Sequence, residues 1–231
     1  MESPTEKTAV SSQTKCETTK RQLTSSEIED RNQRRELFEA FIADRGEMYR
    51  DCRTENYEIY DDAQRGVVET LQAYADDLDE NVTDGRGIML FGTSGTGKDH
   101  LLAAMARVAT NAHGLRVVWS SGQQLFGRIR DTIGTDATEE ALIGQYTRPT
   151  ILLLSDPAPM FGDVTPHQAN MLYRIIDERT NRYRPTWITI NVKDREEANK
   201  KIGGPVVERL AHNAVTARCQ WPSYRMRKGE R

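Results

Sequence analysis

A glycine-rich loop that ends in a lysine is the stretch of this sequence with the most specific chemistry. The apolar run 88–91 stops at Gly92, four residues follow, and then come Gly97 and Lys98. A helical pattern of apolar residues starts at Leu101. Strand, glycine loop, lysine and helix in this order form a P-loop, whose backbone N–H groups and helix N-terminus cradle phosphate. The sequence therefore predicts binding of a polyphosphate; a glycine-rich turn without a ligand is the alternative.

The residue after this lysine departs from the usual pattern. P-loops carry Ser or Thr there, and its hydroxyl binds Mg²⁺, but this chain carries Asp99. A carboxylate can also bind Mg²⁺, yet it brings negative charge toward the phosphates. We therefore expect nucleotide binding, with Asp99 as one candidate Mg²⁺ ligand.

A second acid stands at the end of a later apolar strand. The run 151–154 is apolar throughout, as a central parallel strand requires, and Ser155 and Asp156 follow it. In a P-loop fold this is the place of the Walker B acid that holds Mg²⁺, so Asp156 is the second candidate ligand; an acid that caps the strand end is the alternative. Many such ATPases next have a Glu that orients the attacking water, but here the residue is Pro157, which has no side-chain acceptor. We therefore expect ATP hydrolysis that is slow or that uses a group from elsewhere, and the nearby Asp163 is one candidate.

Two further polar residues are candidates for action on a terminal phosphate. Asn191 lies near the end of the predicted strand 186–192, where a residue that positions water belongs; an ordinary strand-end Asn is the alternative. Arg209 lies on a short helix late in the chain. An arginine supplied to a neighbouring subunit's γ-phosphate stabilises transition-state charge, and a solvated helix arginine is the alternative.

Strand and helix patterns alternate along the chain. We predict strands at 87–92, 115–120, 150–155, 186–192 and 215–220. We predict helices at about 26–44, 67–78, 97–110, 121–132, 137–146 and 195–202, at 205–213, and in a long segment that Thr165 opens. This alternation predicts an α/β protein with a doubly wound, parallel five-stranded sheet.

The chain divides by composition into three parts. Residues 1–24 are almost entirely polar and are expected to form a disordered tail. Residues 25–46 are expected to form one helix, opened by a capping box of Ser26 and Glu29. This helix is either a strut packed on the main domain or an arm that binds a partner. Residues 47–231 form the expected ATP-binding domain.

Charge and composition narrow the partners. The 231 residues carry a net charge of −3, so any contact with DNA needs a local basic patch. The candidates for such a patch are Arg128, Arg130, Lys200, Lys201, Arg218, Arg225, Arg227 and Lys228. The three cysteines form no CxxC pattern, and the four histidines show no ligand spacing, so a zinc site is not indicated. No apolar run approaches the roughly 18 residues of a membrane span, and a cytoplasmic protein is expected.

Taken in order, these motifs resemble the DnaC/IstB-like family, the helicase-loader and transposition-helper branch of the AAA+ ATPases. The segments that carry the resemblance are GTSGTGKDHLLAAM, LLLSD, ITIN, PVVERL and WPSYR. The lead-in MYRDCRTENYEIY is similar to the segment that folds over the nucleotide base in that family. The resemblance covers about residues 47–227.

The resemblance implies an AAA+ fold without a C-terminal lid domain, and ATP with Mg²⁺ as ligands. It implies catalytic roles for Lys98, Asp156, Asn191 and Arg209, the last acting in trans between copies of the chain that assemble through the ATP interface. The residues expected to bind the nucleotide are Gly92, Thr93, Ser94, Gly95, Thr96, Gly97, Lys98, Asp99 and His100. The partners it implies are a replicative helicase or a transposase, and single-stranded DNA.

The function that we predict is an ATP-dependent switch on single-stranded DNA that loads a replicative helicase. An IstB-like transposition helper has the same motifs, and the sequence does not separate the two. A small-molecule P-loop kinase and a nearly inactive ATP-binding scaffold are further alternatives.

Overall fold

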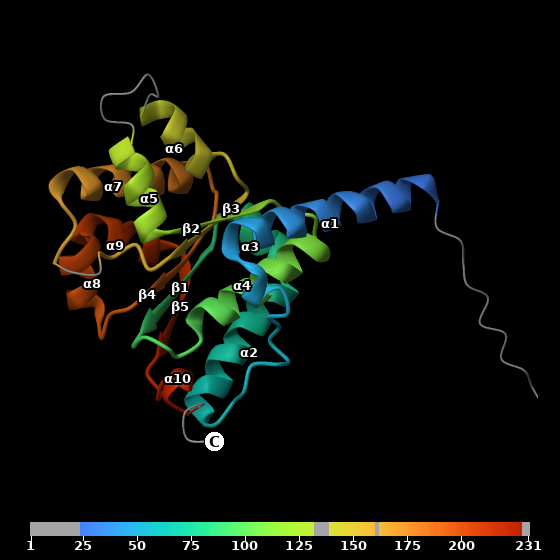
Figure 1. The fold of residues 1–231 in the computed structure, drawn as a ribbon, viewed down its shortest axis with the longest axis horizontal. Helices are drawn as coiled ribbons and strands as arrows, with labels where there is room; N and C mark the ends of the chain where they lie inside the picture. The colour runs from blue at the N-terminus through green and yellow to red at the C-terminus, as the bar shows by residue number, and fades with distance from the viewer. Residues whose placement is uncertain (1–23, 132–138, 160–161, 228–231) are drawn as a thin grey trace, which may run out of the picture.

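A five-stranded parallel sheet forms the centre of the protein (Figure 1). The computed structural model describes residues 24–131, 139–159 and 162–227, so the predicted disordered tail lies almost wholly outside the described residues. The strands are β1 (Gly87–Gly92), β2 (Val117–Ser121), β3 (Ile151–Ser155), β4 (Thr186–Ile190) and β5 (Ala214–Cys219). They lie in the order β2-β3-β4-β1-β5 and every neighbouring pair is parallel. The predicted doubly wound sheet is confirmed.

The helices follow the predicted pattern, but the sequence missed the short ones, the break after Asp76 in the helix predicted at 67–78, and the first turn of that helix, which starts at Asp62 and not at 67. The helices before the P-loop are α1 (Ser25–Arg45), the 3-10 turn η1 (Glu47–Tyr49), α2 (Asp62–Asp76) and α3 (Leu78–Thr83). Those after it are α4 (Lys98–Asn111), α5 (Gly122–Asp131), α6 (Glu139–Thr147), α7 (Pro166–Asn181), α8 (Arg195–Ile202), α9 (Gly204–His212) and α10 (Tyr224–Arg227). Within the described residues, no helix is long and apolar enough to cross a membrane.

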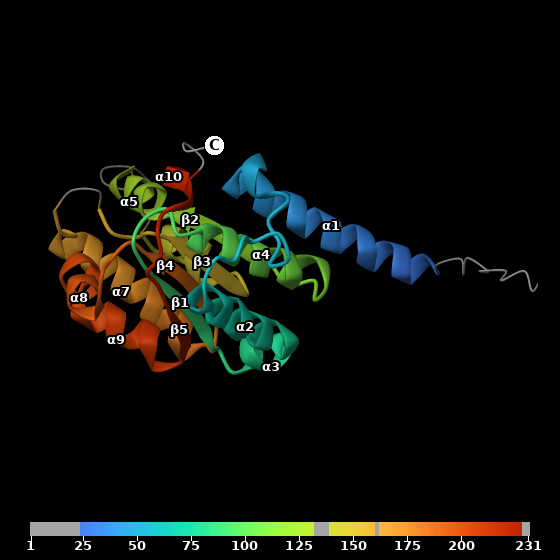
Figure 2. The same ribbon diagram turned by 90° about the horizontal axis from the view of Figure 1, so that it is seen from below.

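Helices lie on both faces of the sheet (Figure 2), and among the described residues a hydrophobic core fills the space on each face. Successive strand residues point to opposite faces, so Ile88 and Leu90 of β1 pack with α1, α2 and α4, whereas Met89 packs with α5 to α9. Both faces of the central strands are therefore buried, which explains why β3 is apolar at four successive positions.

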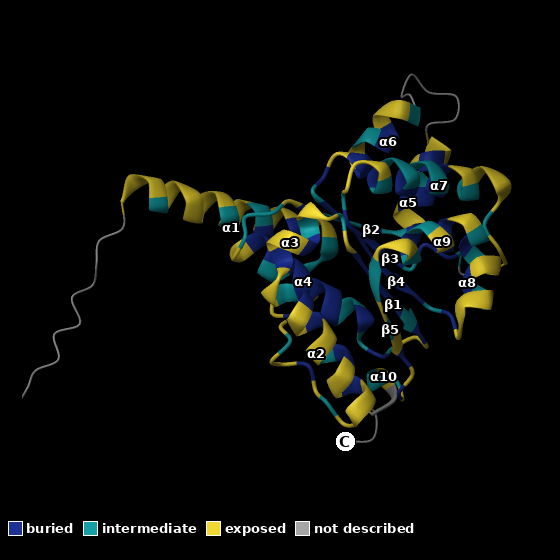
Figure 3. Cartoon of the chain, turned by 180° about the vertical axis from the view of Figure 1, so that it is seen from behind, coloured by how far each residue is buried: buried dark blue, intermediate teal, exposed yellow. Residues whose placement is uncertain are grey.

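Helix α1 is docked along only part of its length. Its capping box is formed by Thr24 and Glu27, two residues before the predicted box, which was wrong in register. Phe38, Phe41 and Ile42 are buried against α4 and β2. The N-terminal half of the helix projects from the domain and is largely exposed (Figure 3). The C-terminal half of the helix thus packs on the domain, as expected for a strut. The N-terminal half is exposed, as an arm that binds a partner would need to be.

A buried arginine on α7 fixes the start of two central strands. Arg179 is fully buried and donates to the carbonyl oxygens of Tyr146, Pro149, Thr150 and Pro185 at 2.9, 2.9, 3.1 and 2.6 Å. It also donates to the Thr186 hydroxyl at 3.1 Å. The side chain joins the end of α6 to the segments before β3 and β4, and so it sets the position of the strands whose far ends reach the P-loop.

Replacement of this arginine by methionine is expected to destabilise the fold strongly. In Arg179→Met, the buried carbonyl groups lose their donors, so the free energy of unfolding should fall by about 3–5 kcal/mol. Urea denaturation followed by circular dichroism measures the change. The matched control is Arg182→Met at the C-cap of the same helix, where a surface pair with Glu178 is lost and the expected change is within about 0.5 kcal/mol. Equal effects of the two variants would contradict the structural role.

Candidate nucleotide-binding site

The loop between β1 and α4 has the backbone conformation of a phosphate cradle. Gly92, Gly95 and Gly97 have φ angles of +148°, +81° and +84°, which side-chain-bearing residues rarely adopt. A Cβ at Gly92 would lie 1.9 Å from the Cys219 carbonyl oxygen, and one at Gly97 would lie 2.6 Å from the Tyr57 ring. These glycines are therefore required both by backbone angle and by space.

The lysine of the loop is folded inward. Lys98 is 5% exposed, and its ammonium donates to the carbonyl oxygens of Gly92 and Thr93 at 3.0 and 2.7 Å. It also donates to the Thr96 hydroxyl at 3.3 Å. Burial lowers the pKa of Lys98, and this effect outweighs the nearby acidic groups that raise it. An ammonium with this environment is stabilised by an added anion, which is what a phosphate supplies.

Two segments from outside the P-loop hold it from behind. The Thr96 carbonyl accepts hydrogen bonds from the Tyr57 hydroxyl and the Trp221 indole, both at 2.8 Å. The backbone N–H of Tyr224 donates to the Gly95 carbonyl at 2.9 Å. Burial, followed by the hydrogen bond to Tyr224, raises the pKa of Tyr57, so its hydroxyl remains a donor. These contacts come from the lead-in and from the WPSYR segment, which the sequence had singled out only by resemblance.

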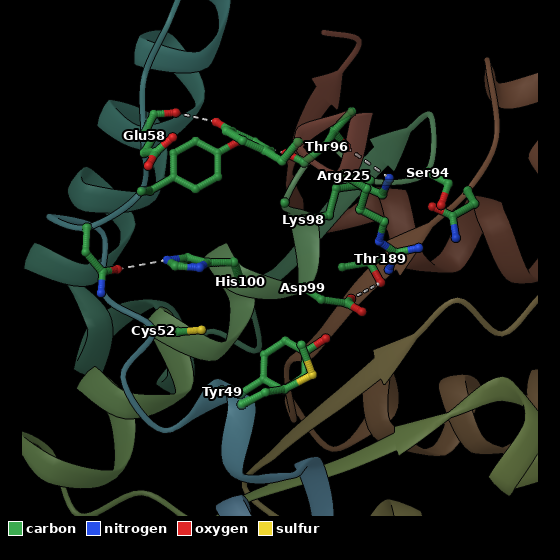
Figure 4. A pocket seen from close by; sticks show the side chains of 17 residues that line it. Tyr49, Cys52, Glu58, Ser94, Thr96, Lys98, Asp99, His100, Thr189 and Arg225 are labelled. Carbon is green, nitrogen blue, oxygen red and sulfur yellow. Dashed lines mark hydrogen bonds between the residues drawn. The ribbon is translucent and has the colours of Figure 1, made fainter. Parts of the chain in front are cut away.

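A cavity of about 360 Å³ lies over the loop (Figure 4). Its lining comes from the lead-in, the P-loop and the start of α4, the end of β4, and α10. The lining residues are Met48, Tyr49, Cys52, Asn56, Tyr57, Glu58, Ser94, Gly95, Thr96, Gly97, Lys98, Asp99, His100, Thr189, Asn191, Tyr224 and Arg225. Of the predicted nucleotide-binding residues, Gly92 and Thr93 do not line the cavity. Their carbonyl oxygens accept hydrogen bonds from the Lys98 ammonium.

Aromatic side chains form one end of this cavity. The Tyr57 ring lies 5.6 Å from the His100 ring and 5.5 Å from the Tyr224 ring, measured between centroids. The His100 Nε2 atom is 3.0 Å from both the Arg53 carbonyl oxygen and the Asn56 side-chain oxygen. As expected from the resemblance, the lead-in lies against the loop, where apolar ring faces can hold a base.

The Asp99 carboxylate is surrounded by donors from three other elements. The Ser155 hydroxyl lies 2.9 and 2.8 Å from its two oxygens, and the Thr189 hydroxyl donates to Oδ1 at 2.8 Å. An Arg45 Nη2 atom donates to Oδ2 at 2.8 Å. Ser155 and Thr189 are register partners at the ends of β3 and β4, so both hydroxyls reach the same carboxylate. Figure 4 shows Asp99 directed toward Thr189 at the edge of the cavity.

This contact exchanges the usual residue types of a P-loop. The common pattern has a hydroxyl after the lysine and a carboxylate at the strand end, which together hold the metal ion. Here the carboxylate is Asp99 and the strand-end group that meets it is the Ser155 hydroxyl. The two positions thus carry one hydroxyl and one carboxylate, as in the common pattern, but the two groups have changed places.

The acid that the sequence analysis placed in the metal site makes a different contact. Asp156 accepts hydrogen bonds from the backbone N–H of Asn191 at 3.1 Å and from its side-chain amide at 2.7 Å. The Asp156 backbone has φ +46°, which turns the chain out of β3. The structure therefore brings the two predicted residues Asp156 and Asn191 together. Asp156 is the residue after Ser155, which is the one that contacts Asp99.

The donor set does not fit Mg²⁺ at Asp99 in this arrangement. Three donors, the Ser155 and Thr189 hydroxyls and the Arg45 guanidinium, already engage both oxygens of this carboxylate, and the positive charge of Arg45 opposes a second cation there. Among the residues that the structure describes, no three His, Cys, Asp or Glu side chains gather where they could hold a metal ion. Asp156 as a metal ligand stays a prediction.

Arg209 lies away from the cavity. Its guanidinium donates to the Tyr173 hydroxyl at 2.9 Å and pairs with Asp177 at 2.6 Å, both on α7. It does not line the nucleotide cavity of its own chain, a position compatible with action on a second copy. That role stays a prediction.

The candidate DNA contacts are spread over several elements. Lys200 and Lys201 each pair with a glutamate one turn earlier on α8. Arg128 and Arg130 are exposed on α5, and Arg218 donates to the Lys193 carbonyl at 3.1 Å. Arg225, in contrast, lines the nucleotide cavity. Lys228 and the side chain of Arg227 lie outside the described residues.

Comparison with known proteins identifies the family. The model of the family described as IstB-like ATP binding protein matches residues 3–231. This chain belongs to that family. The resemblance stated from the sequence is confirmed, and so is a DnaC/IstB-type ATP-binding protein.

Named relatives and solved structures agree with this assignment. The replicative helicase loader DnaC of Buchnera aphidicola (subspecies Schizaphis graminum) is 26% identical over 182 residues, which are 78% of this chain and 71% of that protein. A putative insertion sequence ATP-binding protein of Sinorhizobium fredii is 29% identical over 154 residues, 64% of this chain and 50% of that protein. The crystal structure of the DnaC helicase loader has a TM-score of 0.66 at 20% identity and covers 75% of this chain and 99% of its own.

A second solved structure extends the likeness to replication initiators. AMPPCP-bound DnaA from Aquifex aeolicus has a TM-score of 0.58 at 20% identity, covering 72% of this chain and 50% of its own. At these identities the structural likeness shows the fold, so the predicted AAA+ fold is confirmed.

The exchanged pair makes a quantitative prediction. Ser155→Asp places two carboxylates face to face and should lower the free energy of unfolding by about 1–3 kcal/mol. Adding Asp99→Ser should recover most of this loss, with a coupling energy above about 1 kcal/mol. Urea denaturation of the two single variants and the double variant measures it.

The control uses Ser121, the register partner of Ser155 at the end of β2. Its hydroxyl accepts from the Gln124 backbone N–H at the start of α5, where Asp is also a good cap. Ser121→Asp combined with Asp99→Ser should therefore be additive within about 0.5 kcal/mol. If the effects of Ser155→Asp and Asp99→Ser on the free energy of unfolding were also additive, the contact between these two residues would contribute nothing to stability.

Proposed function

We propose that this protein is an ATP-dependent switch that delivers a replicative helicase to single-stranded DNA. The observation that carries the proposal is the formed phosphate loop, with its buried lysine, beneath a cavity that has an aromatic end. Support comes from relatives named replicative helicase loader. A replication initiator with a similar fold was solved with AMPPCP and single-stranded DNA bound, at a TM-score of 0.60.

In this proposal the loop and its lysine bind the phosphates of ATP. The Lys98 ammonium exchanges the carbonyl groups of its own loop for phosphate oxygens. Arg225, which lines the same cavity, adds a second positive charge. Tyr57 and Tyr224, at the aromatic end, hold the base.

Hydrolysis in this proposal uses the paired residues at the ends of β3 and β4. Asp156 follows the strand residue that meets the P-loop, and Asn191 holds its carboxylate in place. The two are placed to orient an attacking water, and Arg209 serves the site of a neighbouring copy. This assigns Asp156 a role in proton transfer and water positioning, beside the metal-ligand role that the sequence predicts for it.

The free half of α1 is the proposed contact for the helicase. Residues 24–33 are almost all exposed and include Ile28 at 46%. An exposed apolar residue on a projecting helix suits a groove on a partner.

A transposition helper is the second candidate. The family model that matches almost the whole chain is IstB-like, and one relative is a putative insertion sequence ATP-binding protein. Affinity purification of the tagged protein from its own cells, with and without ATP, separates the two. ATP-dependent recovery of the replicative helicase supports the first proposal, and recovery of a transposase replaces it with the second.

Loss of the loop lysine is expected to abolish ATP binding. Lys98→Ala removes the ammonium that faces the outer phosphates, and the dissociation constant for ATP should rise by about 100-fold or more. Isothermal titration calorimetry measures this. Lys200→Ala, which removes an exposed lysine from α8, should bind ATP as the wild type does. Wild-type affinity in Lys98→Ala would refute the proposed nucleotide site.

Loss of Arg209 is expected to separate binding from hydrolysis. Arg209→Ala should leave the affinity of one subunit for ATP unchanged because the side chain lies outside its own cavity. The rate of ATP hydrolysis should fall by about 100-fold or more, as for other arginine fingers. Steady-state phosphate release in the presence of single-stranded DNA measures it, with Arg182→Ala as the control. An unchanged rate would exclude Arg209 from the reaction.

A further inference from the structure

Arg45, the last residue of α1, is held at the nucleotide site by a built pocket. Its guanidinium lies 3.5 Å from the centroid of the Tyr49 ring and 4.4 Å from that of the Trp119 ring. Its side chain is 9% exposed, and its Nη2 atom is 2.8 Å from the Asp99 carboxylate. The two aromatic faces fix the guanidinium by cation–π contact, so this pair has little in common with a mobile surface ion pair.

The partner of this guanidinium stands where ATP is expected. Asp99 lines the nucleotide cavity next to Lys98. Without a counter-charge, its carboxylate would cancel the charge of the lysine and repel a polyphosphate. With Arg45 in place, the group of Asp99, Lys98 and Arg45 keeps one net positive charge. In the usual P-loop, the residue at this position is neutral and the divalent cation supplies the extra charge.

We propose that Arg45 is a positioning residue of the nucleotide site. It neutralises Asp99, so that ATP binds without a divalent cation at this carboxylate. It also makes the docking of α1 a condition for tight ATP binding. This inference rests on the proposed binding of ATP and adds how that binding is controlled.

The control follows from the shape of α1. The half that carries Arg45 is anchored by Phe38, Phe41 and Ile42, and the other half projects from the domain. By linkage, a partner that undocks α1 from the domain weakens ATP binding, and bound ATP stabilises the docked α1 by the same factor. Contact at the projecting half and occupancy of the nucleotide site are thus coupled through one side chain.

The test is a cycle of Arg45→Met and Asp99→Asn on the full chain, with the affinity for ATP measured by calorimetry in EDTA and in Mg²⁺. Wild-type affinity should differ by less than about threefold between the two conditions. Arg45→Met should bind ATP about tenfold or more weakly in EDTA, because the carboxylate is then uncompensated, and Mg²⁺ should restore part of the loss. In EDTA, the double variant should bind like Asp99→Asn alone, because a neutral amide needs no guanidinium.

The matched control is Arg34→Met. Arg34 lies on the same helix, pairs with Asp30 and donates to the Ala112 carbonyl oxygen, but it does not line the cavity. Its loss should leave ATP affinity unchanged in both conditions. A double variant as weak as Arg45→Met would show that Arg45 acts only through the fold and would overturn the inference. A wild type that binds ATP only with Mg²⁺ would overturn it too.

Hydrogen exchange provides a readout that needs no variant. Metal-free ATP should slow exchange of the backbone amides at 38–45 in the wild-type protein, and unchanged exchange would refute the link to α1 even if Arg45→Met failed to fold. A wild type that binds no ATP under any condition would instead refute the proposed function. A wild type that binds ATP, with Arg45→Met equal to it, refutes this inference alone.

Discussion

A partly buried carboxylate must be matched by donors or by a cation, and Asp99 meets this requirement with groups from three separate elements. Ser155 and Thr189 come from neighbouring strand ends, and Arg45 comes from α1. The positions of Ser155 and Thr189 are determined by the register of the parallel sheet, which brings the carboxyl ends of β3 and β4 to one edge. The guanidinium is set by the docking of a helix that precedes the P-loop by more than forty residues in sequence. One side chain thus joins the sheet edge, the phosphate loop and the N-terminal helix.

The phosphate loop shows a similar dependence on distant segments. Its glycines permit the backbone path, but the carbonyl groups of Gly95 and Thr96 are held by Tyr57, Trp221 and Tyr224. These residues come from before β1 and after β5. The loop conformation is therefore a property of the whole domain, and the cavity forms only where both segments are packed against it.

The sequence predicted the elements well because each carries its own periodic signal. Strand β1 was predicted with its observed ends and the other strands within two residues, since apolar runs and flanking turns mark them locally. The P-loop was predictable for the same reason. The capping box of α1 was placed two residues late because Thr24-x-x-Glu27 and Ser26-x-x-Glu29 both match the pattern. Local sequence cannot choose between two overlapping matches.

The contacts of Asp99 could not be predicted because they join residues far apart in the sequence. An acid after the P-loop lysine does indicate that a cation or a set of hydrogen-bond donors must compensate its charge. Periodicity does not say which of the many arginines lies near, or that the Tyr49 and Trp119 rings hold Arg45 in place. The residue type at position 99 thus indicates that a cation or donors are needed, but which residue supplies the cation depends on how α1 docks.

The exchanged pair also changes the meaning of Pro157. The expectation of slow hydrolysis assumed that Asp156 holds the metal ion, which leaves the next residue to orient water. In the structure, Ser155 is the strand residue that meets the P-loop position, and Asp156 is the residue after it. The acid that follows the strand is therefore present, and Asn191 fixes it with two hydrogen bonds. If Asp156 has the water-positioning role proposed above, a proline at 157 removes no acceptor from the site, and the feature that sets this site apart is the charge at residue 99.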